Sequence, residues 1–254
     1  MSTPKISIVT VVFNGERYLE ETILSVHSQS YKNIEYIIVD GNSTDGTKSI
    51  IDRHMDKIDK YISEPDRGLS DAMNKGTLLA TGDWVLHLHA DDTFVDNSSV
   101  ERLIKPVINS AYNWVTGYLK FTDENGVVFK EDKFYKKSWF GMLLRNIIRH
   151  QATLIRRECM SALPFDEHYK YAMDYDFFLR LWKTYGPPLN IKDHIVKFRL
   201  DGNNLSSDYF RSLNDEAEVR KTFRFNNKQN YLRIFDKLIY KIRYYKIVLI
   251  HSKK

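Results

Sequence analysis

The chain has 254 residues, a length that fits one large α/β domain or one domain with an appendage. Its single cysteine, Cys159, excludes an internal disulfide and fits a reducing compartment. No apolar run reaches the 18 or more residues typical of a membrane-spanning helix, and the N-terminal residues lack the pattern of a signal peptide, so we expect neither.

The net charge of +5 is unevenly distributed along the chain. Residues 228–254 carry eight Lys or Arg against one Asp, a local charge of +7, which leaves residues 1–227 at −2. The basic character therefore belongs to the C-terminal segment. Because the main body is net negative, the sequence argues against a general nucleic-acid-binding protein.

The first half of the chain alternates between strand and helix patterns. Apolar, β-branched runs predict strands at residues 5–13, 33–40, 59–66 and 83–92. Apolar residues at helical spacing after the first strand predict a first helix. Ser43 or Thr44 is a candidate N-cap for a second helix, and a third helix is expected at residues 68–82. This alternation predicts right-handed crossovers and a mainly parallel, Rossmann-like sheet, which is an α/β fold.

The second half is less regular. Asn125-Gly126 between two β-rich runs predicts a hairpin, and "HQATLIRRECM" predicts a strand that leads into a helix. Residues 173–186 read as a helix that stops at a glycine, and 194–200 as a strand. From about residue 209 onward the pattern is helical.

Acidic residues gather where the early strands end, at Asp40, Asp66, Asp91 and Asp92. In an open parallel sheet, ligands bind outside the carboxyl ends of the strands, so these side chains should face one crevice. Each could instead cap a helix, as we expect of Asp45, but several acids at several strand ends favour a site.

No glycine-rich phosphate loop follows the first strand. The stretch "VVFNGERY" lacks both G-x-G-x-x-G and G-x-x-x-x-G-K-[ST], which disfavours a Rossmann dehydrogenase and a P-loop NTPase. Phosphates would then need another partner. Paired carboxylates commonly hold Mg²⁺ or Mn²⁺ against a diphosphate, and the metal stabilises the leaving diphosphate.

Long ordered motifs carry a resemblance. The run "ISIVTVVFNGERYLEETILSVHSQSYKNIEYIIVDGNSTDGT", followed by "SEPDRGLSDAMNKGTLLATGDWVLHLHADD", resembles family 2 glycosyltransferases, which have the GT-A fold. The second run, with "RHQATLIRR" and "MDYDFFLRL", resembles the bacterial transferases that build surface polysaccharides such as O-antigen or capsule. The resemblance covers about residues 5–200.

The resemblance implies a set of donor-side residues. Asp40 corresponds to the residue that binds the base of the nucleotide-sugar, and a carboxylate can accept the imide N–H of uracil. Asp91 and Asp92 correspond to the acidic motif for the ribose and a divalent metal, Mn²⁺ or Mg²⁺. The other residues implied to bind the donor nucleotide are Phe13, Asn14, Glu16, Asp66, Arg67 and Asn74; Arg67 and Asn74 could instead be surface residues.

His89 departs from the family pattern, because many relatives carry Asp or Asn at its position. Imidazole can ligate Mn²⁺ but suits Mg²⁺ poorly, so His89 is either a third metal ligand or a neighbour of the ribose. We favour the neighbour. His87 shares its strand face and is expected to pack in the core, and His194 is expected to be structural.

In the second half the resemblance implies that Asp174 is the general base for the acceptor hydroxyl. An alcohol attacks poorly, and a placed carboxylate lowers that barrier by about 10²–10⁴-fold. Direct displacement would invert the anomeric centre. Many relatives carry an acid before this aspartate where this chain has Met173, so Asp176 is the second candidate, although we expect it to pair with Arg180 on the helix surface.

His150 and Gln151 resemble an acceptor-side motif and are expected to bind sugar hydroxyls, with satisfaction of buried backbone as the alternative. The resemblance places the GT-A catalytic domain at 1–208, with a nucleotide-sugar half at 1–95 and an acceptor half at 96–208. Residues 209–254 would form a basic helical extension.

The C-terminal extension is amphipathic, with tyrosines and basic residues between its apolar positions. That pattern suits an anionic membrane surface, and packing on the catalytic domain is the alternative. With the resemblance, it predicts a peripheral protein on the inner face of the cytoplasmic membrane. The expected acceptor is a glycan linked to undecaprenyl diphosphate.

Together these observations predict an inverting, metal-dependent transferase that uses a UDP-hexose or UDP-N-acetylhexosamine. Two alternatives stay open. A nucleotidyltransferase also uses paired carboxylates and metal, but it needs a basic, glycine-rich nucleotide loop that is not visible. A degenerate sugar- or nucleotide-binding protein would keep the fold without catalysis.

Overall fold

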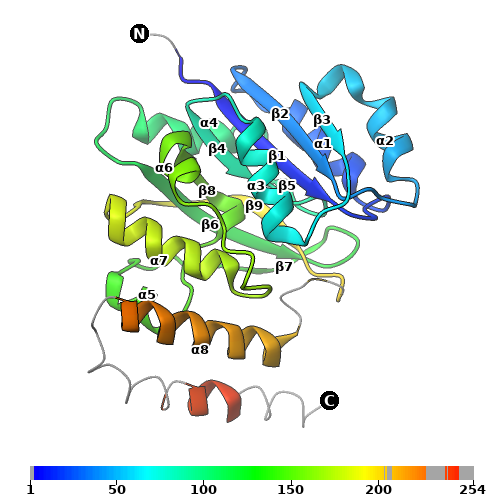
Figure 1. Ribbon diagram of the computed structural model, residues 1–254. Helices are drawn as coiled ribbons and strands as arrows, with labels where there is room; N and C mark the ends of the chain where they lie inside the picture. The colour runs from blue at the N-terminus through cyan, green and yellow to red at the C-terminus, as the bar shows by residue number, and fades with distance from the viewer. Residues whose placement is uncertain (1–2, 203, 205–207, 227–237, 239, 246–254) are drawn as a thin grey trace.

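The computed structural model describes residues 3–202, 204, 208–226, 238 and 240–245. Its centre is one curled sheet with helices on both faces (Figure 1). Along the sheet the strand order is β3-β2-β1-β4-β8-β6-β9-β5, with β7 paired to β6. The strands are β1 Ile6–Val12, β2 Ile34–Asp40, β3 Lys60–Ser63, β4 Trp84–His87, β5 Thr93–Phe94, β6 Trp114–Thr122, β7 Val128–Glu131, β8 Thr153–Arg156 and β9 Leu189–Arg199.

The N-terminal half of the sheet is parallel, as predicted. Strand β1 pairs with β2 and β4, and β2 pairs with β3, all in parallel register. Beyond β4 the pairing is mixed: β8 runs antiparallel to both β4 and β6, whereas β6 and β9 are parallel. The α/β fold class is confirmed, and the predicted hairpin forms between β6 and β7, with Gly126 at a φ of +79°.

Alternation along β1 explains why both faces of the sheet are covered. Ile6 and Ile8 point to one face, under α1 and α2, whereas Val9 and Val11 point to the other, under α3 and α7. The helices are α1 Leu19–His27, α2 Thr47–Arg53, α3 Leu69–Leu79, α4 Ser99–Ile104, α5 Trp139–Leu144, α6 Arg157–Ala162, α7 Met173–Tyr185 and α8 Tyr209–Asn226, with single 3₁₀ turns η1 Met55–Lys57, η2 Lys105–Val107 and η3 His150–Ala152.

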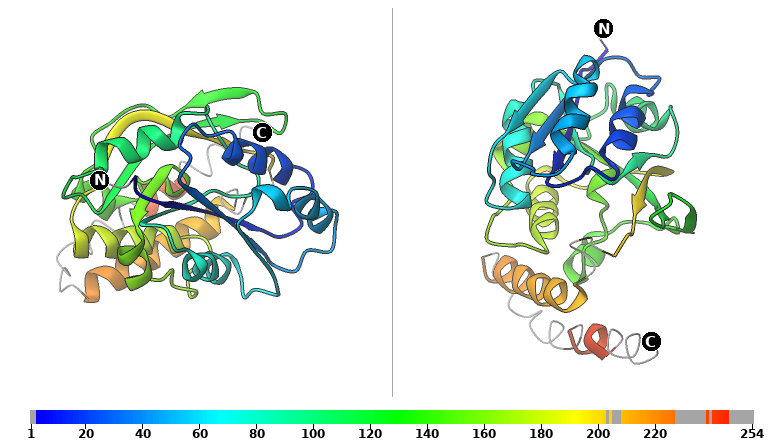
Figure 2. Two further views of the ribbon diagram at one scale, coloured as in Figure 1. Left: turned by 90° about the horizontal axis from the view of Figure 1, so that it is seen from above. Right: turned by 90° about the vertical axis from the view of Figure 1, so that its right-hand side faces the viewer.

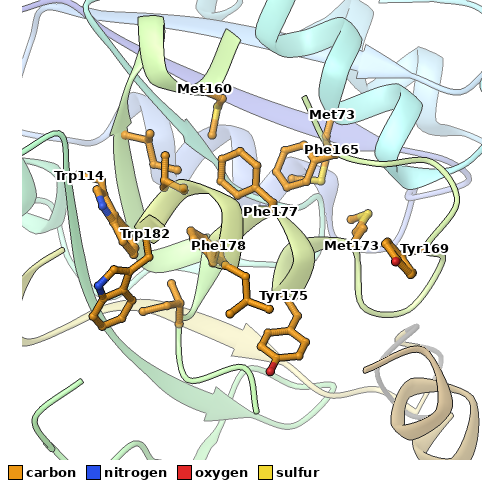
Figure 3. Packing of buried hydrophobic residues seen from close by; sticks show 14 of the residues in the cluster. Met73, Trp114, Met160, Phe165, Tyr169, Met173, Tyr175, Phe177, Phe178 and Trp182 are labelled. Carbon is orange, nitrogen blue, oxygen red and sulfur yellow. The ribbon is translucent and has the colours of Figure 1, made fainter. Parts of the chain in front are cut away.

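The core beside α7 is rich in aromatic side chains (Figure 3). Trp114 of β6 stacks on Phe178 with ring centroids 5.7 Å apart, and Trp182 meets the same indole edge-on at 5.8 Å. Each of these side chains is at most 8% exposed. This packing fixes α7, and with it the position of Asp174 in the first turn of that helix.

Helix α8 and, beyond it, the described residues 238 and 240–245 lie on the side of the molecule that carries α7 (Figure 2). Helix α8 packs on α7, and its buried Arg220 and Arg224 donate to the carbonyl oxygens of Leu144 and Leu143. Most of the basic segment 228–254 lies outside the described residues. No helix in the described part of the chain is long and apolar enough to cross a membrane.

Two local expectations are wrong. Strand β4 ends at His87 rather than at residue 92, because its ladder with β1 stops at Val9 and the chain then turns, with Asp92 N donating to His89 O. Neither Ser43 nor Thr44 caps α2: that helix starts at Thr47, and the Ser43 hydroxyl instead binds Asp40.

Candidate active site

A cavity of about 450 Å³ lies at the carboxyl ends of β1 and β4. Phe13 and Asn14 line it from the end of β1, and His89 and Asp91 line it from the turn after β4. We call it the donor cavity. The side chain of Phe13 is 65% exposed, which is unusual for a large apolar residue and suits a platform for a flat ligand.

Asn14 and Glu16 shape the donor cavity through the neighbouring loop. Asn14 adopts a φ of 51°, a left-handed conformation that Asn tolerates, and its Oδ1 accepts from Thr44 N at 2.9 Å. Glu16 Oε2 accepts from Gly46 N at 2.6 Å. Asp45 Oδ1 accepts from the backbone N and the hydroxyl of Thr47, the first residue of α2, although the N-cap position of that helix is Gly46. Asn14 and Glu16, which were both predicted to bind the donor nucleotide, therefore line the cavity and also hold the loop before α2.

Asp40 is fully buried at the end of β2 and does not line the donor cavity. Its carboxylate accepts from the backbone and hydroxyl of Ser43, and from Ser63 Oγ at 2.6 Å. Asp66 lies beside it, because a Cβ added at Gly41 would come within 2.4 Å of Asp66 Oδ2 and 3.3 Å of the Phe13 ring. Of the four strand-end acids only Asp91 lines the donor cavity, so their predicted convergence on one crevice is wrong for that cavity.

The acidic pair sits in a tight turn that α1 holds in place. Thr22 Oγ1 donates to the carbonyl oxygens of Ala90 and Asp92, at 2.9 and 2.8 Å. Asp91 is half-buried and faces the donor cavity, whereas the side chain of Asp92 is fully buried. Burial raises the pKa of Asp91 above its usual value and that of Asp92 well above it, and the neighbouring Asp91 charge adds to the second shift.

Arg199 at the end of β9 fixes this turn, a role that its local sequence does not indicate. Its backbone N donates to Asp92 Oδ1 at 3.1 Å, and its guanidinium donates to Asp91 O at 3.1 Å and to Glu21 at 2.5 Å. The side chain is 4% exposed. A buried arginine beside two carboxylates offsets part of their repulsion and holds the turn rigid.

The chemistry of these side chains fits a hard divalent cation. Asp91 offers a carboxylate to the cavity, and the buried Asp92 carboxylate has two polar neighbours, the backbone N of Arg199 and the side chain of Gln151. Oxygen donors of this kind suit Mg²⁺ or Mn²⁺, and a cation would reverse the raised pKa values. Among the described residues no three His, Cys, Asp or Glu side chains converge, so these side chains alone would not complete the coordination of such a cation.

A second cavity, of about 550 Å³, adjoins the first and contains Asp174. We call it the acceptor cavity. Asp174 Oδ2 accepts from Asn146 Nδ2 at 2.8 Å, and its side chain is 24% exposed. His150 and Gln151 line the same cavity, with aromatic rings that include Tyr135, Phe121 and Tyr171. Aromatic faces and a half-exposed carboxylate suit the binding of a sugar ring and a hydroxyl.

A pair of histidines links the two cavities. His150 Nε2 lies 3.0 Å from His89 Nε2, and His150 Nδ1 lies 3.6 Å from Asp174 Oδ2. A consistent neutral assignment has His89 donating to His150 and the Nδ1–H of His150 facing Asp174. Burial lowers the pKa of His89 well below its usual value, with repulsion from His150 adding, so His89 is neutral.

Asp176, the second base candidate, is used elsewhere. Its Oδ2 accepts from Arg180 Nε at 2.8 Å, which confirms the expected ion pair on α7. Asp176 lines neither of the two cavities. His87 is 3% exposed with Nε2 3.2 Å from Met73 O, which confirms that it packs in the core.

Two predicted donor residues have other partners. Arg67 is exposed and pairs with Asp71 and Glu167, at 2.8 and 2.9 Å. Asn74 uses both groups of its amide on the backbone of Phe165, at 2.9 Å each. Neither residue lines the donor cavity. The structure therefore shows both residues joining α3 to the segment before α7, and their contact with the donor stays a prediction.

The chain is similar to known proteins in sequence and in fold. Residues 7–184 match the family model described as glycosyl transferase family 2. An uncharacterised glycosyltransferase of Haemophilus influenzae is 31% identical over 217 residues, which cover 84% of this chain and 86% of the relative. A PGL/p-HBAD biosynthesis glycosyltransferase of Mycobacterium bovis is 29% identical over 192 residues, covering 72% of each chain.

Solved structures show the same fold. Mannosyltransferase PcManGT of Pyrobaculum calidifontis, in complex with GDP-Man and Mn²⁺, has a TM-score of 0.70 at 16% identity over 100% of this chain and 76% of that chain. Residues 1–349 of TarS from S. aureus, in complex with UDP-GlcNAc, have a TM-score of 0.66 at 20% identity, covering 87% of this chain and 66% of that chain.

Proposed function

The chain belongs to glycosyl transferase family 2, and from that premise we propose that it transfers a sugar from a nucleotide-diphosphate donor to a glycan acceptor. One observation supports this most: His89 and His150 join a cavity that holds Asp91 to a cavity that holds Asp174. A displacement between two bound substrates requires an acidic group near the donor phosphates and a carboxylate base near the acceptor hydroxyl, in adjoining cavities.

The donor is a UDP-sugar, a UDP-hexose or UDP-N-acetylhexosamine. In support, Phe13 lines the donor cavity with an exposed ring, and solved structures of the same fold carry UDP-GlcNAc or, with Mn²⁺, GDP-Man. Asp91 and Asp92 would hold Mn²⁺ or Mg²⁺, which neutralises charge on the leaving diphosphate when it is bound.

In the transfer step, Asp174 accepts the proton of the acceptor hydroxyl while that oxygen attacks the anomeric carbon. The bond from this carbon to the diphosphate oxygen breaks, and the nucleoside diphosphate leaves with the bonding electrons. Asn146 orients the carboxylate through its 2.8 Å hydrogen bond, and His150 faces the same oxygen. Attack opposite the leaving group inverts the anomeric centre.

The acceptor is a lipid-linked glycan, on undecaprenyl diphosphate, in the synthesis of a surface polysaccharide such as O-antigen or capsule. The protein acts at the inner face of the cytoplasmic membrane and contacts it through its basic C-terminal segment. Exposed Leu238, Ile242 and Tyr245, at 54–62%, support that contact.

A screen of nucleotide-sugars with Mn²⁺ tests the proposal. Wild-type protein should hydrolyse or transfer from one UDP-sugar, and Asp174→Asn should bind that donor without transferring from it. Binding of a nucleotide-sugar with no turnover in any condition would instead favour a non-catalytic binding protein. Release of diphosphate from a nucleoside triphosphate and a sugar 1-phosphate, supplied in a separate assay, would indicate a nucleotidyltransferase.

A further inference from the structure

A third cavity, of about 380 Å³, adjoins the acceptor cavity. It shares Tyr135, Arg145 and Arg243 with the acceptor cavity, so those three residues form the boundary between the two. Its walls come from α5, from the segments on either side of that helix and from residues 242–243. Figure 1 shows these parts of the chain beside and below α8. We call it the apolar pocket, lined by Tyr135, Lys136, Ser138, Gly141, Leu144, Arg145, Ile147, Ile242 and Arg243.

The boundary is positively charged. Arg145 and Lys136 are both exposed, and neither side chain makes a hydrogen bond or ion pair that involves another described residue. Arg243 is paired with Glu216, with Nη2 and Oε1 3.0 Å apart. The contrast with Arg149 is informative, because that guanidinium is held by both oxygens of Asp132 at 2.9 Å. Arg145 therefore stands where the cavities meet without an acidic partner among the described residues, and Lys136 lines the apolar pocket beside it.

The pocket beyond these cations is made of hydrocarbon. Leu144, Ile147 and Ile242 form its walls, and Ile242 is 60% exposed. An aliphatic side chain left open beside a pocket gains free energy when another hydrocarbon covers it, at about 25 cal/mol per Å² buried. Sugars do not supply such a surface, because their hydroxyls would lose hydrogen bonds to water there.

We propose that the apolar pocket, with Arg145 and Lys136 at its entrance, is a subsite for the prenyl-diphosphate end of the acceptor. The inference rests on the proposed function and adds the recognition site for the lipid. The order of groups in such an acceptor is hydroxyl, sugar, diphosphate and hydrocarbon. That order matches Asp174, the acceptor cavity, the two cations and the apolar pocket, and arginine is well suited to phosphate oxygens.

Calorimetric binding of farnesyl diphosphate to the full chain tests the subsite. The buffer contains EDTA, so that diphosphate does not bind through a metal at the donor cavity. Wild-type protein should bind farnesyl diphosphate at least 10-fold more tightly than either farnesol or inorganic diphosphate. Arg145→Gln and Ile242→Gln should each weaken farnesyl diphosphate binding about 10-fold. Arg53→Gln on α2 and Leu78→Gln on α3 are matched exposed controls that should leave it unchanged.

Two results would overturn the subsite. Equal binding of farnesol would leave only a hydrophobic surface, and equal binding of inorganic diphosphate would leave only an anion site. Titration of the same proteins with UDP-sugars and Mn²⁺ separates this outcome from failure of the proposed function. If the protein turns over the donor but Arg145→Gln binds farnesyl diphosphate as tightly as wild type, only the subsite proposal is wrong. If the protein binds no donor at all, the proposed function is wrong.

Discussion

His89 and His150 contact each other through their Nε2 atoms, 3.0 Å apart, although 61 residues separate them in the sequence. His89 follows β4 and borders the donor cavity, whereas His150 begins η3 and lines the acceptor cavity. The far nitrogen of His150 faces Asp174 at 3.6 Å. One imidazole therefore touches both halves of the proposed reaction, and it does so from a position fixed by buried neighbours, Gln151 and Ala152.

The base assignment predicts different outcomes for two aspartates on the same helix. Asp174→Asn should lower the rate of sugar transfer by at least 10²-fold and leave donor binding intact, because an amide cannot accept the hydroxyl proton. Asp176→Asn is the matched control and should keep most of the activity, since its partner is Arg180. Full transfer activity in Asp174→Asn would show that another group is the base.

The histidine pair predicts unequal effects of two substitutions. His150→Ala should reduce kcat about 10-fold or more with little change in donor affinity, because Asp174 loses an orienting neighbour. His89→Asn should retain activity and metal preference, because the imidazole of His89 contacts His150 and is not expected to be a metal ligand. A shift of preference from Mn²⁺ to Mg²⁺ in His89→Asn would instead place the metal on the imidazole.

Removal of metal should abolish transfer, and Mn²⁺ should restore it. Asp91→Asn should weaken nucleotide-sugar binding in Mn²⁺ at least 10-fold, because it removes the carboxylate that faces the donor cavity. Asp45→Asn, in the same cavity, is the control: its carboxylate binds Thr47 and should matter less for donor affinity. Equal affinities of wild type and Asp91→Asn, with and without EDTA, would argue for a metal-independent enzyme.

The sequence predicted the parallel half of the sheet and the acids at its strand ends because both signals are local. A β-branched apolar run predicts a buried strand, and the residue that follows it lies at the edge of the sheet where ligands bind. No local sequence pattern predicts the residue at which β4 ends. It ends at His87 because its partner β1 ends its ladder there, which only the pairing reveals.

The residues that position the site were harder to predict because their partners are distant in sequence. Arg199 lies 107 residues from Asp92, and Asn146 lies 28 residues from Asp174. Each reads locally as an ordinary strand-end or loop residue. Arg67 and Asn74 also have distant partners, Glu167 and Phe165 of the second half, which their local sequence does not indicate.

Glu35 provides a test of the packing between β2 and the start of β4. It is 3% exposed and accepts from Ser7 at 2.5 Å, from Thr81, and from Lys5 at 3.2 Å. These partners outweigh burial and hold its pKa far below the usual value. Glu35→Gln should lower the free energy of unfolding by about 1–3 kcal/mol at pH 7, because buried donors lose an ionised acceptor.

The sign of the Glu35 effect with pH follows from the lowered pKa. Its stabilisation is complete above the unfolded pKa of about 4.3 and is lost as the pH falls below that value. The difference between wild type and Glu35→Gln should therefore shrink between about pH 5 and pH 3, measured by urea denaturation. A difference that is constant over that range would contradict the ionised, hydrogen-bonded state of Glu35.

Lys137 predicts a dependence on pH in the alkaline range. It is 7% exposed, its Nζ donates to Gly117 O at 3.0 Å and to Asn190 Oδ1 at 2.8 Å, and it lies 3.9 Å from the Tyr118 ring centroid. Burial lowers its pKa to about 7, and the charge of Arg149 adds to that shift. The group is therefore a buried lysine whose partners only partly offset the loss of water.

Between pH 7 and the unfolded pKa of about 10.4, the unfolded chain binds more protons at Lys137 than the folded chain does. Its contribution to stability thus rises with pH across this window, by up to about 1.4 kcal/mol per pH unit. Lys137→Met removes the titration, so its free energy of unfolding, measured by urea denaturation at pH 7, 8 and 9, should rise less steeply than that of wild type. Lys133→Met, an exposed control, should keep the wild-type slope. Equal slopes for wild type and Lys137→Met would mean that Lys137 titrates like an exposed lysine in the folded protein.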